Sequence, residues 1–137
     1  MKKLPLIARI LLGLIFFVFG LNGFFNFLPA PPMPDKAAAF AGGLMASGYF
    51  FPFLKATEVL CGALLLAGAM VPLALVVLAP IIVNIILFHG FLAPSGLPLA
   101  LVIAALEAYL AFFAEPYAGI VKQIFRCPMR EAMLAKK

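Results

Sequence analysis

Charged side chains are scarce in this chain. Of its 137 residues, 10 are lysine or arginine and 5 are aspartate or glutamate, whereas 66% are hydrophobic. A soluble domain is typically about 45–50% apolar and about a quarter charged. A chain this short cannot hide so much apolar surface in one aqueous core. The shortage of charge therefore excludes an ordinary soluble domain and indicates that lipid surrounds most of the chain.

Residues that bind metals or carry catalysis in soluble enzymes are also few. The chain has one histidine, His89, with no second ligand three or four residues away, so we expect no metal site. It has no glycine-rich phosphate loop, CxxC pair or serine–histidine–acid set. Cys61 and Cys127 fall at different predicted depths, whereas a disulfide requires Cα atoms within about 7 Å. Soluble-enzyme chemistry therefore has no visible basis in the sequence.

Four long apolar runs are present instead, at residues 4–28, 52–70, 73–91 and 97–114. A helix needs about 20 mainly apolar residues to span a bilayer, and none of the runs alternates as a strand of a membrane barrel does. The first run is longer than the apolar part of a signal peptide, about 7–15 residues, so we expect it to be retained. The sequence predicts an all-α membrane protein, with a four-transmembrane-helix bundle over 1–116 and a cytoplasmic helical tail over 117–137.

The first predicted loop begins with LPAPPMPD, whose prolines stop a helix because they cannot donate backbone hydrogen bonds. Asp35 is a candidate N-cap for a short helix, KAAAFAGGLMAS, that is too short to span. We expect this helix to lie at the outer interface, with Tyr49, Phe50 and Phe51 as an aromatic anchor. It could be a lid over a site or a surface connector, and we favour the connector.

Basic residues lie near or beyond the ends of the apolar runs. Lys2, Lys3 and Arg9 flank the start of the first run. Five more follow the last run: Lys122, Arg126, Arg130, Lys136 and Lys137. Lysine and arginine stay on the cytoplasmic side, and an even number of spans places both termini on one side. We therefore predict a multi-pass protein of the bacterial inner membrane with both termini in the cytoplasm.

The tail has the pattern of a basic amphipathic helix on the cytoplasmic leaflet, broken at Pro128. Its apolar residues share one face: Ile120, Val121, Ile124 and Phe125. The basic residues around this face are expected to contact anionic lipid at about 1 kcal/mol each, namely Lys122, Arg126 and Arg130. Alternatively, these basic residues only follow the positive-inside pattern, which requires no binding partner.

Polar residues inside the predicted spans gather at a shared depth. A helix rises about 1.5 Å per residue. This rise places six polar residues in the outer half of the membrane and Glu107 near its middle. The six are Asn22, Asn26, Lys55, Glu58, Asn84 and His89. An ionisable group near the bilayer centre costs about 2.5–3.5 kcal/mol, so Glu58 and Glu107 should face the interior. Lys55 can pair with Glu58, three residues on, or extend to the surface, which we favour.

These polar residues form the candidate site. Its predicted ligand-binding members are Asn22, Lys55, Glu58, Asn84 and Glu107, with Asn26 and His89 as weaker candidates. The same residues could instead form a satisfied polar network that holds the helices together. Asn84 and His89 are five residues apart, about 140° around a helix, so those two should not share a face.

Two segments and one residue carry a resemblance to a known family. The segments are ARILLGLIFFVFGLNG and KATEVLCGALLLAG, the second of which contains Glu58, Gly62 and Gly68, and the residue is Glu107 in the last span. The chain resembles the DoxX family of small four-span bacterial membrane proteins over most of residues 5–115. Members often carry a lysine where this chain has Asn22. The resemblance implies a membrane location and an association with quinone, thiosulfate or thiol redox systems.

Three functions fit these observations. The first is a redox-associated membrane subunit with an outer pocket for a quinone or similar lipophilic molecule, acting in a redox complex or a homo-oligomer. The second is a non-catalytic accessory or assembly factor that packs through small-residue seams such as the alanines of residues 100–111. The third, a small-solute or proton carrier, ranks last because no inverted repeat is evident.

Overall fold

A computed structural model describes residues 2–136, which form seven α-helices and one short 3-10 helix. Lys137, counted above among the basic residues of the tail, lies outside the described residues. Four helices are long and apolar enough to cross a membrane: α1 (Leu4–Phe25), α3 (Phe50–Ala67), α4 (Val71–Phe91) and α5 (Leu97–Phe112), which the 3-10 turn Pro94–Gly96 precedes. The predicted all-α bundle with four spans is confirmed.

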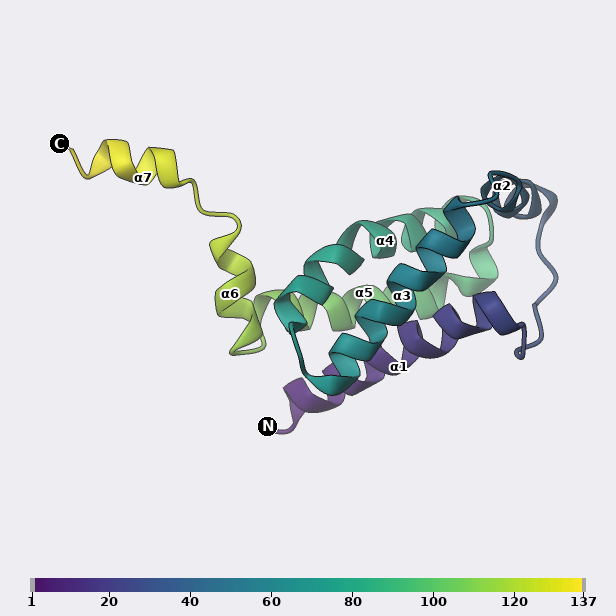
Figure 1. The fold of residues 1–137 in the computed structure, drawn as a ribbon, viewed down its shortest axis with the longest axis horizontal. Helices are drawn as coiled ribbons and strands as arrows, with labels where there is room; N and C mark the ends of the chain where they lie inside the picture. Colours follow the sequence, from purple (N-terminus) through teal and green to yellow (C-terminus); the bar gives the residue numbers. More distant parts are fainter. Residues whose placement is uncertain (1, 137) are drawn as a thin grey trace.

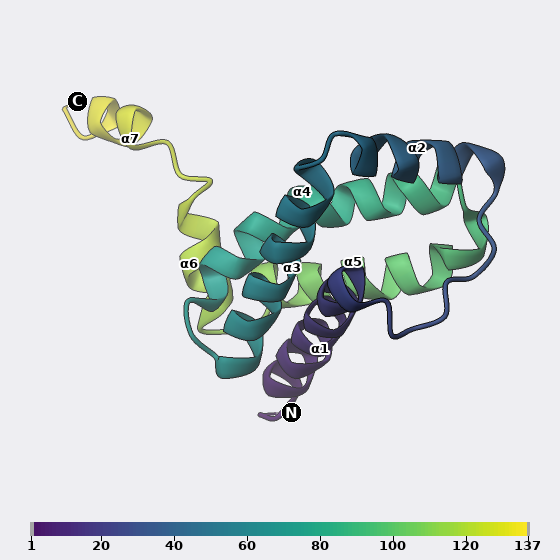
Figure 2. The ribbon, with the colours of Figure 1, turned by 45° about the vertical axis from the view of Figure 1, so that its right-hand side comes forward.

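Helices α1, α3, α4 and α5 lie side by side along the long axis of the molecule (Figure 1). Helix α2 (Asp35–Ala46) covers one end of this bundle, and both chain termini lie toward the other end (Figures 1 and 2). We call the end that carries α2 the outer end and the opposite end the inner end. The arrangement agrees with an even number of spans.

The most extensive helix contact in the bundle joins α1 to α3, and glycines make it possible. A methyl group on Gly62 would lie 2.5 Å from the backbone nitrogen of Phe17 and 2.9 Å from the carbonyl oxygen of Gly13. At Gly20 the nearest atoms are Cγ2 and the backbone nitrogen of Val59, at 2.8 Å and 3.0 Å. Within lipid, helices associate mainly by van der Waals packing, so small residues that let backbones approach are the principal source of attraction. These glycines therefore set the position of α3 along α1.

The buried core runs between the four long helices. Its largest fully buried side chains are Leu12, Leu65, Leu75, Leu78, Leu110 and Val71, which come from all four spans. Cys61 is buried in the same core and Cys127 is exposed on the tail, and both thiols are free. The predicted separation of the two cysteines is confirmed.

The first outer loop differs in one detail from its prediction. Asp35 is the first residue of α2 and makes no side-chain cap hydrogen bond, while Pro34 holds the N-cap position. The predicted capping by Asp35 is therefore wrong by one residue. The helix is attached to the bundle by Phe40, whose ring centroid lies 5.7 Å from that of Phe88 on α4.

The tail forms two helices, α6 (Tyr117–Gln123) and α7 (Pro128–Leu134), so the predicted break at Pro128 is confirmed. Helix α6 packs against α4 and α5, and it buries Ala118 and Val121. The expectation that Val121 faces lipid together with Ile120 is therefore wrong. The basic residues Lys122, Arg126 and Arg130 are all exposed. Helix α7 stands away from the bundle in both views (Figures 1 and 2).

Candidate functional site

A cavity of about 340 Å³ lies in the outer half of the bundle, and we call it the outer cavity. Helices α1, α3, α4 and α5 all contribute to its wall, and Pro31 of the proline-rich loop closes one side. Its lining is mostly apolar, with three polar side chains at the outer end. The lining residues are Ile15, Phe16, Phe19, Pro31, Lys55, Glu58, Ile85, His89, Gly96, Leu99 and Ile103.

Lys55 and Glu58 form an ion pair at this cavity. The Nζ of Lys55 donates a hydrogen bond to Oε2 of Glu58 at 2.9 Å, and the ammonium lies 5.7 Å from the ring centroid of Phe51. The Lys55 side chain is 19% exposed and that of Glu58 is 6% exposed. The favoured expectation that Lys55 extends to the membrane surface is therefore wrong. Pairing with Glu58 and the Phe51 ring holds the ammonium inward.

The glycines of α1 bring this pair close to the helix. A methyl group on Gly23 would meet the aliphatic chain of Lys55 at 2.5 Å, and one on Gly20 would lie 3.2 Å from Cβ of Glu58. Larger residues at either position would push the pair away from α1. The packing of α1 on α3 thus also places the polar residues of the outer cavity.

His89 belongs to the same cavity, although its sequence context made it only a weak candidate. Its Nδ1 lies 3.0 Å from the carbonyl oxygen of Ala93. A carbonyl oxygen only accepts hydrogen bonds, so Nδ1 carries the proton, and in the neutral ring Nε2 is then an acceptor. The ring occupies the space that a side chain on Gly96 would need. The turn from α4 to α5 therefore fixes the orientation of the imidazole.

The three asparagines do not line the outer cavity. The side-chain oxygen of Asn22 accepts a hydrogen bond from the backbone N–H of Leu28 at 2.7 Å. Asn26 is exposed and ends α1 in a left-handed conformation, with φ of 49°. Asn84 is exposed on α4, in a shallow hollow beside Phe88 and away from His89. The predicted separation of Asn84 from His89 is confirmed, and Asn84 does not join Glu58.

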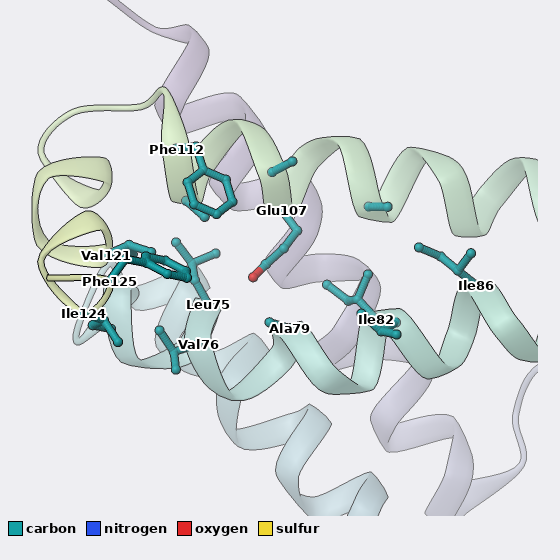
Figure 3. Close-up of a pocket in the computed structure, with 14 residues that line it drawn as sticks. Leu75, Val76, Ala79, Ile82, Ile86, Glu107, Phe112, Val121, Ile124 and Phe125 are labelled. Atoms are coloured by element: carbon teal, nitrogen blue, oxygen red, sulfur yellow. The ribbon is translucent and has the colours of Figure 1, made fainter. Parts of the chain in front are cut away.

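Glu107 lies in a second cavity of about 310 Å³, which we call the inner groove. Figure 3 shows its carboxyl group pointing from α5 into the space above Ala79 of α4. Helix α6 forms the inner wall of this groove. The lining residues are Leu75, Val76, Ala79, Ile82, Val83, Ile86, Ala104, Glu107, Ala108, Ala111, Phe112, Val121, Ile124 and Phe125. The structure therefore divides the predicted site between two cavities.

Several lining residues were not expected from the sequence. Phe16, Phe19 and Pro31 of the outer cavity are apolar, and an apolar residue in a membrane protein carries no signal that distinguishes a cavity wall from a lipid contact. Val121 of α6 and the two residues after that helix, Ile124 and Phe125, also line the inner groove, although they come from a segment expected on the membrane surface. The only signal in the sequence was the small side chain of Ala118, which permits α6 to pack closely on the bundle.

The described part of the chain brings together no group of three or more histidine, cysteine, aspartate or glutamate side chains. In the comparisons with known proteins, the family model that matches the chain is that of DoxX, over residues 4–91. This range contains α1, α3 and α4, with Lys55, Glu58 and His89, and ends before Glu107. No curated protein and no solved structure matches the chain.

Proposed function

Because the chain belongs to the DoxX family and carries four helices that can cross a membrane, we propose that it binds a quinone or a similar lipophilic molecule in the outer cavity. The chain is a multi-pass membrane protein of small size. The membrane that we propose is the bacterial inner membrane, with both termini in the cytoplasm, because the basic residues near both chain termini lie toward the inner end of the bundle.

The observation that supports this proposal is the composition of the outer cavity. An ion pair from α3 and an imidazole from α4 meet at one end of a space that is otherwise lined by apolar side chains. Small-molecule sites commonly combine a mainly apolar wall with a few convergent polar groups, in volumes of about 300–1,000 Å³. A lipophilic molecule with a polar head matches both parts of the cavity.

Lys55 and His89 can bind such a head group directly, and Glu58 holds the ammonium of Lys55 in place. Lys55 has three N–H donors and uses one of them for Glu58, so it can donate to a quinone carbonyl oxygen. The free Nε2 of His89 can accept a hydrogen bond from a quinol hydroxyl group. In this role the chain would hold the quinone for a partner redox protein in the membrane.

A second candidate function is that of a non-catalytic accessory or assembly factor. The observation in its favour is that Lys55 and Glu58 already satisfy each other and lie against the glycines of α1. Such a pair could hold α1 and α3 in register without any ligand. The two candidates differ in whether the purified protein carries a lipophilic molecule.

The decisive experiment is mass spectrometry of the quinones that co-purify with the protein in lipid nanodiscs. We expect about one quinone per chain in the wild type. Glu58→Gln should lower retention at least about tenfold, since a hydrogen bond to a charged group contributes about 1.5–3 kcal/mol. His89→Asn, which keeps a donor near the position of Nδ1 and removes Nε2, should also lower retention.

The matched control is Asn84→Leu, because Asn84 lines neither cavity. Its quinone content should equal that of the wild type. Size-exclusion chromatography of each variant separates loss of ligand from loss of folding. A well-folded wild type that carries no quinone would refute the binding role, and recovery of a stable partner complex would then support the accessory function.

A further inference from the structure

The carboxyl group of Glu107 is buried in the inner groove without a partner. The residue is 8% exposed, and its Oε2 is buried with no hydrogen-bond partner among the described residues. Buried polar atoms are almost always paired, and each exception requires an explanation. Glu58 differs in this respect, because Lys55 neutralises it at 2.9 Å. The unpaired acid indicates that a group from outside the chain completes the site.

The rest of the inner groove contains no charge of either sign. Its other lining residues are all alanine, valine, leucine, isoleucine or phenylalanine. An ionised carboxylate in such surroundings is costly unless an opposite charge pairs with it. A second anion in the groove would add repulsion to that cost, whereas a cation would remove it. Between the two kinds of charged occupant, the electrostatics therefore favour a cation.

Two aromatic rings face the same space. Phe112 of α5 and Phe125, which follows α6, both line the groove, and their ring centroids are 6.0 Å apart (Figure 3). The face of an aromatic ring attracts a cation by about 0.5–2 kcal/mol, and quaternary ammonium groups are a common ligand of such rings. A carboxylate beside two phenyl rings is a suitable receptor for a poorly hydrated organic cation.

The groove has a size and an opening that suit a lipophilic ligand. Small side chains, among them Ala79, Ala104 and Ala108, leave a space of about 310 Å³ between α4 and α5. Val83 and Ile124 at its edge are 55% and 60% exposed, so in a membrane the groove opens toward lipid. An occupant would therefore enter from the bilayer, with its apolar part against the groove wall.

We propose that the inner groove binds a lipophilic organic cation, such as an amphiphile with a quaternary ammonium head, with Glu107 as its counter-charge. The site is separate from the outer cavity and does not depend on the function proposed for that cavity. A zwitterionic phospholipid fits less well, because its phosphate would lie close to the Glu107 carboxylate. A free cation with a single apolar chain satisfies both the charge and the volume.

The test is equilibrium binding of radiolabelled decyltrimethylammonium to the full chain in nanodiscs of phosphatidylglycerol, a lipid without an ammonium group. Empty nanodiscs measure partition into lipid. We expect saturable binding near one per chain, and no saturable binding of decanesulfonate, which has the same chain and opposite charge. Glu107→Gln should weaken binding at least about tenfold, which corresponds to about 1.4 kcal/mol. Asn84→Leu should leave it unchanged.

Two further variants keep the proposal falsifiable if Glu107→Gln affects folding. Ala108→Phe fills the groove without changing the carboxyl group, and it should abolish saturable binding. Phe125→Leu should weaken binding about 2- to 30-fold, the range that the cation–π energy covers. Equal binding of the cation and the sulfonate, or wild-type affinity in either Glu107→Gln or Ala108→Phe, would overturn the proposal. The quinone content of Glu107→Gln, if unchanged, shows that the two sites are independent.

Discussion

The crossing of α1 and α3 makes a quantitative prediction for Gly62→Ala. The added methyl carbon would lie 2.5 Å from the backbone nitrogen of Phe17, about 0.9 Å inside the 3.4 Å at which ordinary contact begins. Its other near neighbours are also backbone atoms, the oxygen of Gly13 and Cα of Phe17, both at 2.9 Å. A side chain could rotate away, but a helix backbone cannot. The two helices must therefore separate.

The cost of this separation can be estimated from packing energies. A radial gap of about 0.5–1 Å forfeits about a quarter to a half of the dispersion energy of each contact, and extra methyl groups in packed interiors cost about 1–3 kcal/mol. We expect Gly62→Ala to lower the free energy of unfolding by about 1–3 kcal/mol. Ligand retention should fall as well, because α3 carries Lys55 and Glu58 to the outer cavity.

The assay is unfolding by sodium dodecyl sulfate in mixed micelles, followed by far-ultraviolet circular dichroism. The matched control is Gly90→Ala near the end of α4, where a methyl group meets no atom within 4 Å. Alanine favours a helix over glycine by up to about 1 kcal/mol, so the control should be neutral or stabilised. Equal free energies for the two variants would refute the argument that backbone contact limits this crossing.

Five other variants can be measured in the same titration. Gly68→Ala and Gly48→Ala both place a methyl group at positive φ, which costs about 1–2 kcal/mol. Only the methyl group of Gly68→Ala also meets the guanidinium of Arg9, so this variant should lose more unfolding free energy than Gly48→Ala. Equal losses of unfolding free energy would contradict that contact. Asn22→Leu should cost about 0.5–1.5 kcal/mol by removing the acceptor for the loop N–H, whereas Asn22→Asp should cost less. Arg126→Ala removes an exposed ion pair and should cost under about 1 kcal/mol; a larger loss would mean that α7 stabilises the bundle.

The number, length and order of the spans followed from hydropathy, because the length of an apolar run and its lack of charge are local properties of the sequence. The shared level of Lys55, Glu58 and His89 along the bundle followed from the helical rise. The rotation of each helix about its axis, which decides the residues that face a cavity, was harder to predict. Helix α4 is apolar around its circumference, so nothing in its pattern indicated that Asn84 is exposed while His89 lines a cavity.

The division of the site into two cavities could not be predicted, because it depends on contacts between segments far apart in the chain. The inner groove exists because α6 returns to pack on α4 and α5 and brings Phe125 close to Phe112. The sequence pattern of α6 fits a membrane surface and a protein surface equally well. Similarly, the inward position of Lys55 depends on the space that Gly23 of α1 leaves for its chain.

The two buried glutamates are chemically identical, and their partners make them different. Glu58 lies beside Lys55, so the outer cavity contains one charge of each sign and suits a neutral molecule with hydrogen-bonding groups. Oε2 of Glu107 has no hydrogen-bond partner within residues 2–136, and the inner groove contains a single carboxyl group beside two phenyl rings. The loop next to α2 contributes Pro31 to the wall of the outer cavity, whereas the tail contributes Val121, Ile124 and Phe125 to the wall of the inner groove. One bundle therefore contains two separate cavities, and the balance of charge in each decides which class of ligand we propose for it.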